Sequence, residues 1–137
     1  MQLNPKRPTN KGPAERFTGE VYVDPVARGP EPSRVQINSV HFTPGARSAW
    51  HSHGSGQTLW VTEGVGRVQT RGEAIVEIRA GDVVTTPPDE QHWHGAAPEQ
   101  FMTHVSITEN LPDHPDMWGD HVSDAEYNGR ATRPDGA

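Results

Sequence analysis

The fold is decided by one stretch of the chain, Gly45-Ala46-Arg47-Ser48-Ala49-Trp50-His51-Ser52-His53-Gly54-Ser55-Gly56-Gln57. In an extended strand, side chains two residues apart point to the same side and lie roughly 7 Å apart along the chain. His51 and His53 can therefore bind one metal ion together. Gln57 follows a flexible glycine-containing segment and can return an oxygen ligand. Because a single His-x-His pair is often only a surface accident, this interpretation needs support from elsewhere in the chain.

A second segment gives that support, because it contains another His-x-His pair, His92-Trp93-His94. His92 offers a further ligand, and His94 points to the same side of the strand. His104 adds an imidazole from a later strand. The sequence thus predicts a divalent metal site made by His51, His53, Gln57 and His92. Imidazole and amide ligands suit Mn, Fe, Co, Ni or Zn.

Length and composition exclude several classes of protein. The 137 residues fit one domain. Lys and Arg number 12 against 18 Asp and Glu, a net charge of −6, so neither nucleic acid nor an anionic membrane is an expected partner. The absence of Cys excludes disulfides, Cys-type zinc sites and thiol catalysis. Since the chain has no long apolar run or apolar leader, we expect a cytoplasmic protein.

Short β-forming segments separated by Gly and Pro turns predict an all-β sandwich or small barrel, with an open meander as the alternative. A turn is expected at Glu63-Gly64, and the capping-box pattern Ser123-Asp124-Ala125-Glu126 predicts one short helix. The expected organisation is an N-terminal arm over 1–16, a barrel over 17–110 and a tail over 111–137. The expected strands are Phe17–Val23, Val35–Phe42, Ser48–His53, Gln57–Thr62, Val65–Thr70, Ala74–Ile78, Val83–Thr86, Gln91–His94 and Phe101–Thr108.

The first histidine segment resembles the first motif of the cupin superfamily. That motif is Gly, five residues, His-x-His, three or four residues, Glu, six residues and Gly. At this spacing the chain has Gly45, His51, His53, Gln57 and Gly64. The departure is Gln57, where the family usually has Glu.

The second segment resembles the second cupin motif, which is Gly, five residues, Pro-x-Gly, two residues, His, three residues and Asn. The chain matches it at Gly81, Pro87 and His92, and departs from it at Asp89 and Ala96. The resemblance covers Val35 to about Thr108. It implies a single-domain cupin, that is, a double-stranded β-helix or jelly-roll barrel, here with an N-terminal arm and a short C-terminal helix.

Replacing Glu by Gln57 leaves a neutral ligand set, so a bound ion keeps more positive charge and favours an anionic ligand. Among cupins this set resembles small bacterial manganese-dependent hydroxynitrile lyases, as do Phe17-Thr18-Gly19 and the tail around Trp118 and Tyr127. The resemblance implies a manganese-dependent lyase that cleaves or forms a cyanohydrin, a small-molecule substrate made of an aldehyde and HCN. A metal-dependent dioxygenase or other oxidoreductase, and a non-catalytic small-molecule-binding cupin, stay open as alternatives.

Two histidines near the ligands are the candidate catalytic acid and base, His94 and His104. The alternative for His94 is that it only orients His92, and for His104 that it is a core residue bonded to backbone. The residues expected to line the substrate pocket share their strand faces with the site: Asn38, Val40, Met102 and Ser106. Asn38 could equally be an exposed polar strand residue.

Several apolar residues have the opposite strand parity to the ligands and would lie outside the barrel: Trp50, Trp60, Trp93, Phe101, Val105 and Ile107. A contiguous external apolar patch usually marks an interface. We therefore expect a homodimer or a homo-oligomer built from dimers. The alternative is that the chain's own N-terminal arm and C-terminal helix cover the patch.

Overall fold

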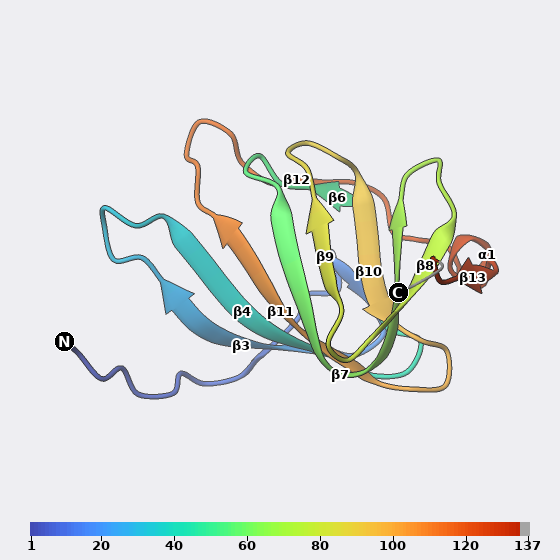
Figure 1. Ribbon diagram of the computed structural model, residues 1–137, viewed down its shortest axis with the longest axis horizontal. Helices are drawn as coiled ribbons and strands as arrows, with labels where there is room; N and C mark the ends of the chain where they lie inside the picture. The colour runs from blue at the N-terminus through green and yellow to red at the C-terminus, as the bar shows by residue number, and fades with distance from the viewer. Residues whose placement is uncertain (135–137) are drawn as a thin grey trace.

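The computed structural model of the chain describes residues 1–134, in which nearly all regular structure is β-strand (Figure 1). The predicted strands over Val35–Phe42 and Val83–Thr86 have the expected bounds. The elements are β1 (Asn10–Lys11), β2 (Phe17–Thr18), β3 (Val21–Arg28), β4 (Val35–Phe42), β5 (Arg47–Ser48), β6 (His51–Ser52), β7 (Gln57–Thr70), β8 (Ile75–Arg79), β9 (Val83–Thr86), β10 (His92–Ala96), β11 (Met102–Glu109), β12 (Met117–Trp118), α1 (Asp124–Tyr127) and β13 (Ala131–Thr132).

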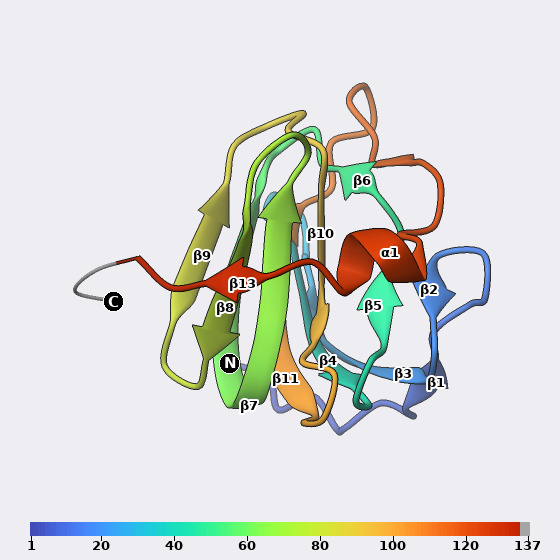
Figure 2. The same ribbon diagram turned by 90° about the vertical axis from the view of Figure 1, so that its right-hand side faces the viewer.

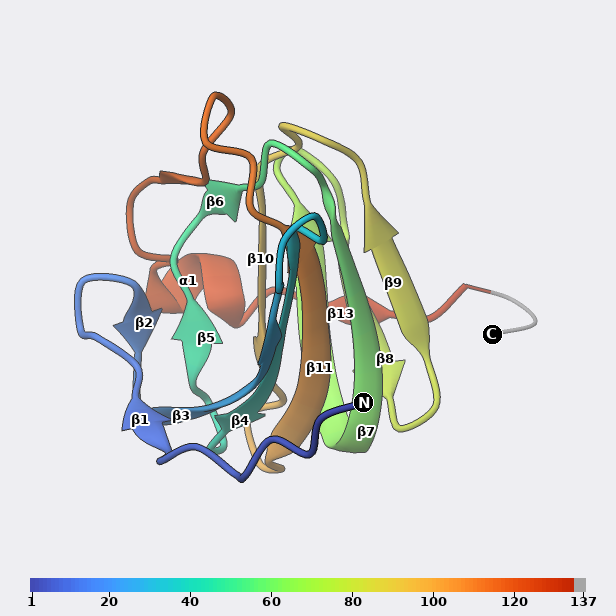
Figure 3. The same cartoon turned by 90° about the vertical axis from the view of Figure 1, so that its left-hand side faces the viewer.

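The strands form one sheet that curls until its two halves face each other (Figures 2 and 3). One half has the order β1-β3-β4-β11-β7, with β9 also paired to β7. The other half has the order β2-β5-β10-β7, with β8 paired to β7 and β6 paired to β10. This arrangement confirms the predicted all-β barrel with one short C-terminal helix.

The long strand β7 joins the two halves. Its first residues pair with β9 and β11, and its last residues pair with β8 and β10. The predicted turn at Glu63-Gly64 is wrong, because β7 continues through it. Gly64 has φ 79°, and a Cβ there would overlap the carbonyl oxygen of Phe101. Glycine therefore allows the strand to bend from one half of the sheet to the other.

The main core lies between the two halves, where alternate residues of the strands point inward. Val21, Phe42, Val61 and Met102 are almost completely buried there. Burial of such side chains contributes about 1.5–3 kcal/mol each to folding.

A second apolar cluster lies outside the barrel, where Trp50 and Trp93 pack with Val122 and Tyr127. The Tyr127 hydroxyl donates to the carbonyl oxygen of Ala96 at 2.5 Å. The predicted helix α1 is present and has the expected capping box at Ser123. Trp50 and Trp93 lie outside the barrel as expected, and the C-terminal segment covers both rings, which was the alternative to an intermolecular interface at this part of the patch.

The N-terminal arm is anchored to the barrel edge, since β1 pairs with β3 and β2 pairs with β5. Within residues 1–134, α1 is only four residues long, and no helix has the length and hydropathy needed to cross a bilayer.

Candidate metal centre

Three buried histidines converge at one end of the barrel. His51 is on β6, His53 follows directly after it, and His92 opens β10 opposite His51. The expected single strand over Ser48–His53 is instead two short strands, β5 and β6. One ring nitrogen from each histidine lies within 4.8 Å of the corresponding atoms of the other two. Each ring is thus placed to give one ligand to a common ion.

The hydrogen bonds of the three rings fix which nitrogen is available. The Nδ1 atoms of His51 and His92 donate to the backbone oxygens of Ala49 and Glu90 at 2.8 and 2.9 Å. The Nδ1 atom of His53 donates to a carboxylate oxygen of Asp116 at 2.8 Å. Because these partners can only accept, Nδ1 carries the proton in each ring and Nε2 presents its lone pair.

The free Nε2 atoms are in an environment that fits a cation. The Nε2 atom of His53 is buried and has no hydrogen-bond partner within residues 1–134. The side-chain nitrogen of Gln57 donates to Ser106 at 2.9 Å, which turns its oxygen toward His92. That oxygen lies 2.9 Å from Nε2 of His92, so two hydrogen-bond acceptors face each other. A metal ion between them would remove this conflict, and the donor set therefore fits a divalent ion.

Burial keeps the imidazoles of His51 and His92 neutral. It lowers the pKa of His92 to about 4, despite the hydrogen bond to Glu90 that raises it. Burial also lowers the pKa of His51 well below its usual range, and the neighbouring His92 and His53 lower it further. Neutral imidazole is the form that binds a metal ion.

His94 and His104 extend the cluster into the barrel. The Nε2 atom of His104 lies 2.9 Å from Nδ1 of His94, and Nε2 of His94 lies 3.3 Å from Nε2 of His51. The Nε2 lone pair of His51 is the one offered to a metal ion and cannot also accept from His94, whereas Nε2 of His104 can donate to Nδ1 of His94. The Nδ1 lone pair of His104 is then free, and this buried atom has no hydrogen-bond partner among the described residues.

Burial lowers the pKa of both histidines, to about 3 for His104 and well below the usual range for His94, where the nearby His104 and His51 also contribute. The alternatives considered for these residues can now be compared with the geometry. Nε2 of His94 lies close to His51 rather than to His92, and His104 bonds to His94. The two rings form a hydrogen-bonded pair that ends beside a candidate metal ligand.

The four residues expected to line a pocket all come from β4 and β11. Ser106 is opposite Asn38 in the strand register, and His104 is opposite Val40. Ser106 bonds to Gln57, whereas Val40 and Met102 are buried in the main core. Asn38 is half-buried and lines a cavity beneath the N-terminal arm.

Two residues near the ligands were missed by the sequence reasoning. Asp116 binds His53, and the ring of Trp118 stacks on His51 with centroids 4.5 Å apart and an interplanar angle of 15°. Both belong to the tail, which reaches the site through the two-residue strand β12, paired with β6. A strand of two residues is too short to show an alternation of polar and apolar side chains, so the hydrophobic pattern did not indicate it.

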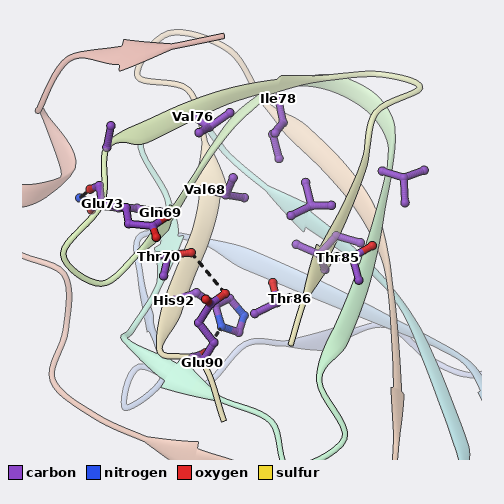
Figure 4. A pocket seen from close by; sticks show the side chains of 14 residues that line it. Val68, Gln69, Thr70, Glu73, Val76, Ile78, Thr85, Thr86, Glu90 and His92 are labelled. Carbon is purple, nitrogen blue, oxygen red and sulfur yellow. Dashed lines mark hydrogen bonds between the residues drawn. The ribbon is translucent and has the colours of Figure 1, made fainter. Parts of the chain in front are cut away.

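A cavity of about 310 Å³ lies behind His92, between β7, β8 and β9 (Figure 4). Val68, Val76 and Ile78 form part of its wall, and Thr86 and Glu90 lie near the histidine. The hydroxyl of Thr70 donates to the Glu90 carboxylate at 3.4 Å at this end (Figure 4). The cavity is therefore polar beside His92 and apolar at its far end (Figure 4).

Comparison with known proteins agrees with this geometry. Residues 38–107 match the model of the Cupin domain family. The chain is 51% identical over 119 residues to a protein of Granulicella tundricola named "(R)-mandelonitrile lyase", which covers 87% of this chain and 91% of that protein.

Solved structures give the same result. A cupin-like protein from Thermotoga maritima has a TM-score of 0.82 and 38% identity, and covers 93% of this chain and 95% of its own. A polyketide cyclase from Streptomyces resistomycificus shares the fold at 16% identity, with a TM-score of 0.69 and coverage of 93% and 90% of the two chains. The chain therefore belongs to the cupin family.

Proposed function

We propose that this cupin is a metal-dependent carbon–carbon lyase that cleaves or forms cyanohydrins. The observation that carries the proposal is the ligand set of three neutral imidazoles and one amide, extended by the His94–His104 chain. The name of the 51% identical relative, "(R)-mandelonitrile lyase", supports the same reaction class. We propose Mn²⁺ as the ion, because the cupins that this ligand set resembles use manganese.

A divalent ion held by His51, His53, Gln57 and His92 would supply Lewis acidity to a substrate oxygen. His104 takes the proton of the cyanohydrin hydroxyl on its free Nδ1, and His94 keeps the other ring nitrogen of His104 in place. The oxygen then forms the carbonyl of the aldehyde, the C–C bond breaks, and its electron pair leaves with cyanide. Cyanide receives the proton from His104 and leaves as HCN.

The test is aldehyde release from racemic mandelonitrile under nitrogen. We expect activity from Mn-loaded protein, and loss of activity after chelation and in Gln57→Ala. His104→Ala should lose at least about 100-fold in rate while its metal content stays unchanged. The matched control is His41→Ala, since His41 lies on the outer face and bonds to Asp24 at 2.8 Å. No release above background from loaded wild-type protein would refute the lyase, and a rate that requires oxygen would favour an oxidoreductase.

We also propose that the protein is a homodimer, formed through the outer face of the sheet half that contains β4, β11, β7 and β9. Trp60 is 51% exposed and Val83 is 62% exposed on adjacent strands, and Val105 is opposite Trp60 in the register. Ile37 and Ile107 continue this apolar surface as a second cross-strand pair. Light scattering after size-exclusion chromatography should give twice the 15.0 kDa chain mass, and Trp60→Glu should give the monomer. A wild-type mass of one chain would exclude the dimer.

A further inference from the structure

Two neighbouring cavities, each of about 360 Å³, share Arg28 and Gln36 in their walls. The first lies between the N-terminal arm and strands β3 and β4, and includes Asn38. The second lies between Arg16, the end of β11 and the tail, and includes Asp116 and Trp118. We call these two cavities together the vestibule.

Arg28 faces the inside of the barrel. A register shift between Pro25 and Ala27 brings Arg28 opposite Gln36 on β4. On the next strand, Thr108 is opposite Gln36, and it lies on the same face of β11 as His104. Since directly paired residues point to the same side of a sheet, Arg28 shares the face that carries the catalytic candidates. Its position is thus set by the bulge in β3.

The vestibule has an excess of positive charge, although the whole chain has a net charge of −6. Four cationic side chains line it, namely Arg7, Lys11, Arg16 and Arg28, against the two carboxylates of Glu109 and Asp116. Asp116 is already bonded to His53. Within residues 1–134, neither Arg16 nor Arg28 has a carboxylate within 4.0 Å, so both guanidinium groups are available to an anion.

The vestibule also shares wall residues with the surroundings of the metal centre. The guanidinium of Arg16 lies 4.9 Å from the centre of the Trp118 ring, and that ring stacks on His51. Asp116 connects the same wall to His53. A molecule held by Arg16 and Arg28 therefore lies beside the parts of the chain that orient two of the candidate ligands.

We propose that the vestibule binds a carboxylate group of the substrate, so that the natural substrate is a small organic acid with a hydroxyl or carbonyl group for the metal. The argument is charge complementarity, because Arg forms paired hydrogen bonds with carboxylates and a chain of net negative charge otherwise repels them. The proposal rests on the proposed function, since it names the substrate class of the same site. It departs from mandelonitrile, which is uncharged.

The test compares mandelate with mandelamide, which has the same skeleton without the charge. Binding of each to metal-loaded protein is measured by isothermal titration calorimetry, so that no turnover is required. We expect mandelate to bind more tightly, and to weaken about tenfold in Arg28→Gln and in Arg16→Gln, whereas mandelamide binding stays unchanged. Raising the salt concentration from about 50 to 300 mM should weaken the binding of mandelate but not that of mandelamide. Melting temperatures identify a variant that does not fold. If one of the two arginine variants fails to fold, the other variant tests the proposal.

The matched control is Arg79→Gln, which removes the same charge from β8, far from β3 across the molecule (Figure 1). Equal affinities for mandelate and mandelamide would overturn the proposal, because the carboxylate would then contribute nothing. It would also be overturned if the metal alone held the carboxylate, in which case both arginine variants would bind mandelate within about twofold of wild type. Tighter binding of inorganic phosphate than of mandelate would overturn the assignment to an organic acid. If the lyase assay fails, this binding experiment still tests whether the vestibule binds a carboxylate, because it requires no turnover.

Discussion

Asp116 accepts the Nδ1 proton of His53, and replacing it by alanine should weaken metal binding. Partners of this kind, which orient a ligand from behind, typically contribute about 10- to 100-fold to metal affinity. The Asp116 side chain is 48% exposed, so water can replace part of the lost acceptor. We therefore expect the lower end of that range, about tenfold, or about 1.4 kcal/mol.

The affinity is measured by titrating metal-stripped protein with Mn²⁺ and reading free Mn²⁺ from its EPR signal. Asp116→Asn should keep most of the affinity, because the amide oxygen can still accept the hydrogen bond. Asp113→Ala is the matched control, since Asp113 is an exposed acid of the same loop and has no ion pair among residues 1–134. Affinity of Asp116→Ala within about twofold of wild type, or an equal loss in Asp113→Ala, would refute the reasoning.

Three further predictions concern stability. Gly64→Ala should destabilise by several kcal/mol more than Gly72→Ala in urea denaturation, because both have positive φ but only at Gly64 would a Cβ overlap a backbone oxygen; equal losses would contradict the role given to the bend. Tyr127→Phe should cost about 1 kcal/mol, since it removes the hydrogen bond to a β10 carbonyl, and an unchanged urea midpoint would argue against it. Hydrogen bonds from Arg133 and a backbone amide lower the pKa of Asp82. Their stabilisation is therefore present above the unfolded pKa near 3.8 and is lost as the pH falls through the folded pKa. Arg133→Gln should lower the melting temperature at pH 7 more than at pH 2, and equal decreases at both pH values would contradict a stabilising Arg133–Asp82 ion pair.

The sequence predicted the strands best where turn residues and alternation agreed. Val35–Phe42 is followed by Thr43-Pro44-Gly45, and the observed β4 ends at Phe42. The turn predicted at Glu63-Gly64 was wrong because glycine favours turns and strand bends for the same reason, its access to positive φ. Only the pairing of β7 with strands of both sheet halves distinguishes the two.

The clustering of the candidate histidines could be predicted because each His-x-His pair is local in sequence, with a spacing of two. Asp116 and Trp118 could not, because they reach the site through a tail without a repeating pattern. Parity correctly placed Trp50 and Trp93 outside the barrel, but it could not decide between an interface and coverage by the C-terminal segment, which is what the structure has. Arg28 was missed for a similar reason, since the bulge in β3 reverses the side to which it points.

The measurement that tests the account most directly is the rate of aldehyde release from mandelonitrile as Mn²⁺ is added in steps to metal-stripped protein under nitrogen. With the proposed single site of His51, His53, Gln57 and His92 in each chain, the rate should rise in proportion to the metal and reach a plateau at one equivalent. A rate that does not respond to Mn²⁺, or that rises without a break at one equivalent, would contradict a lyase that works through this site.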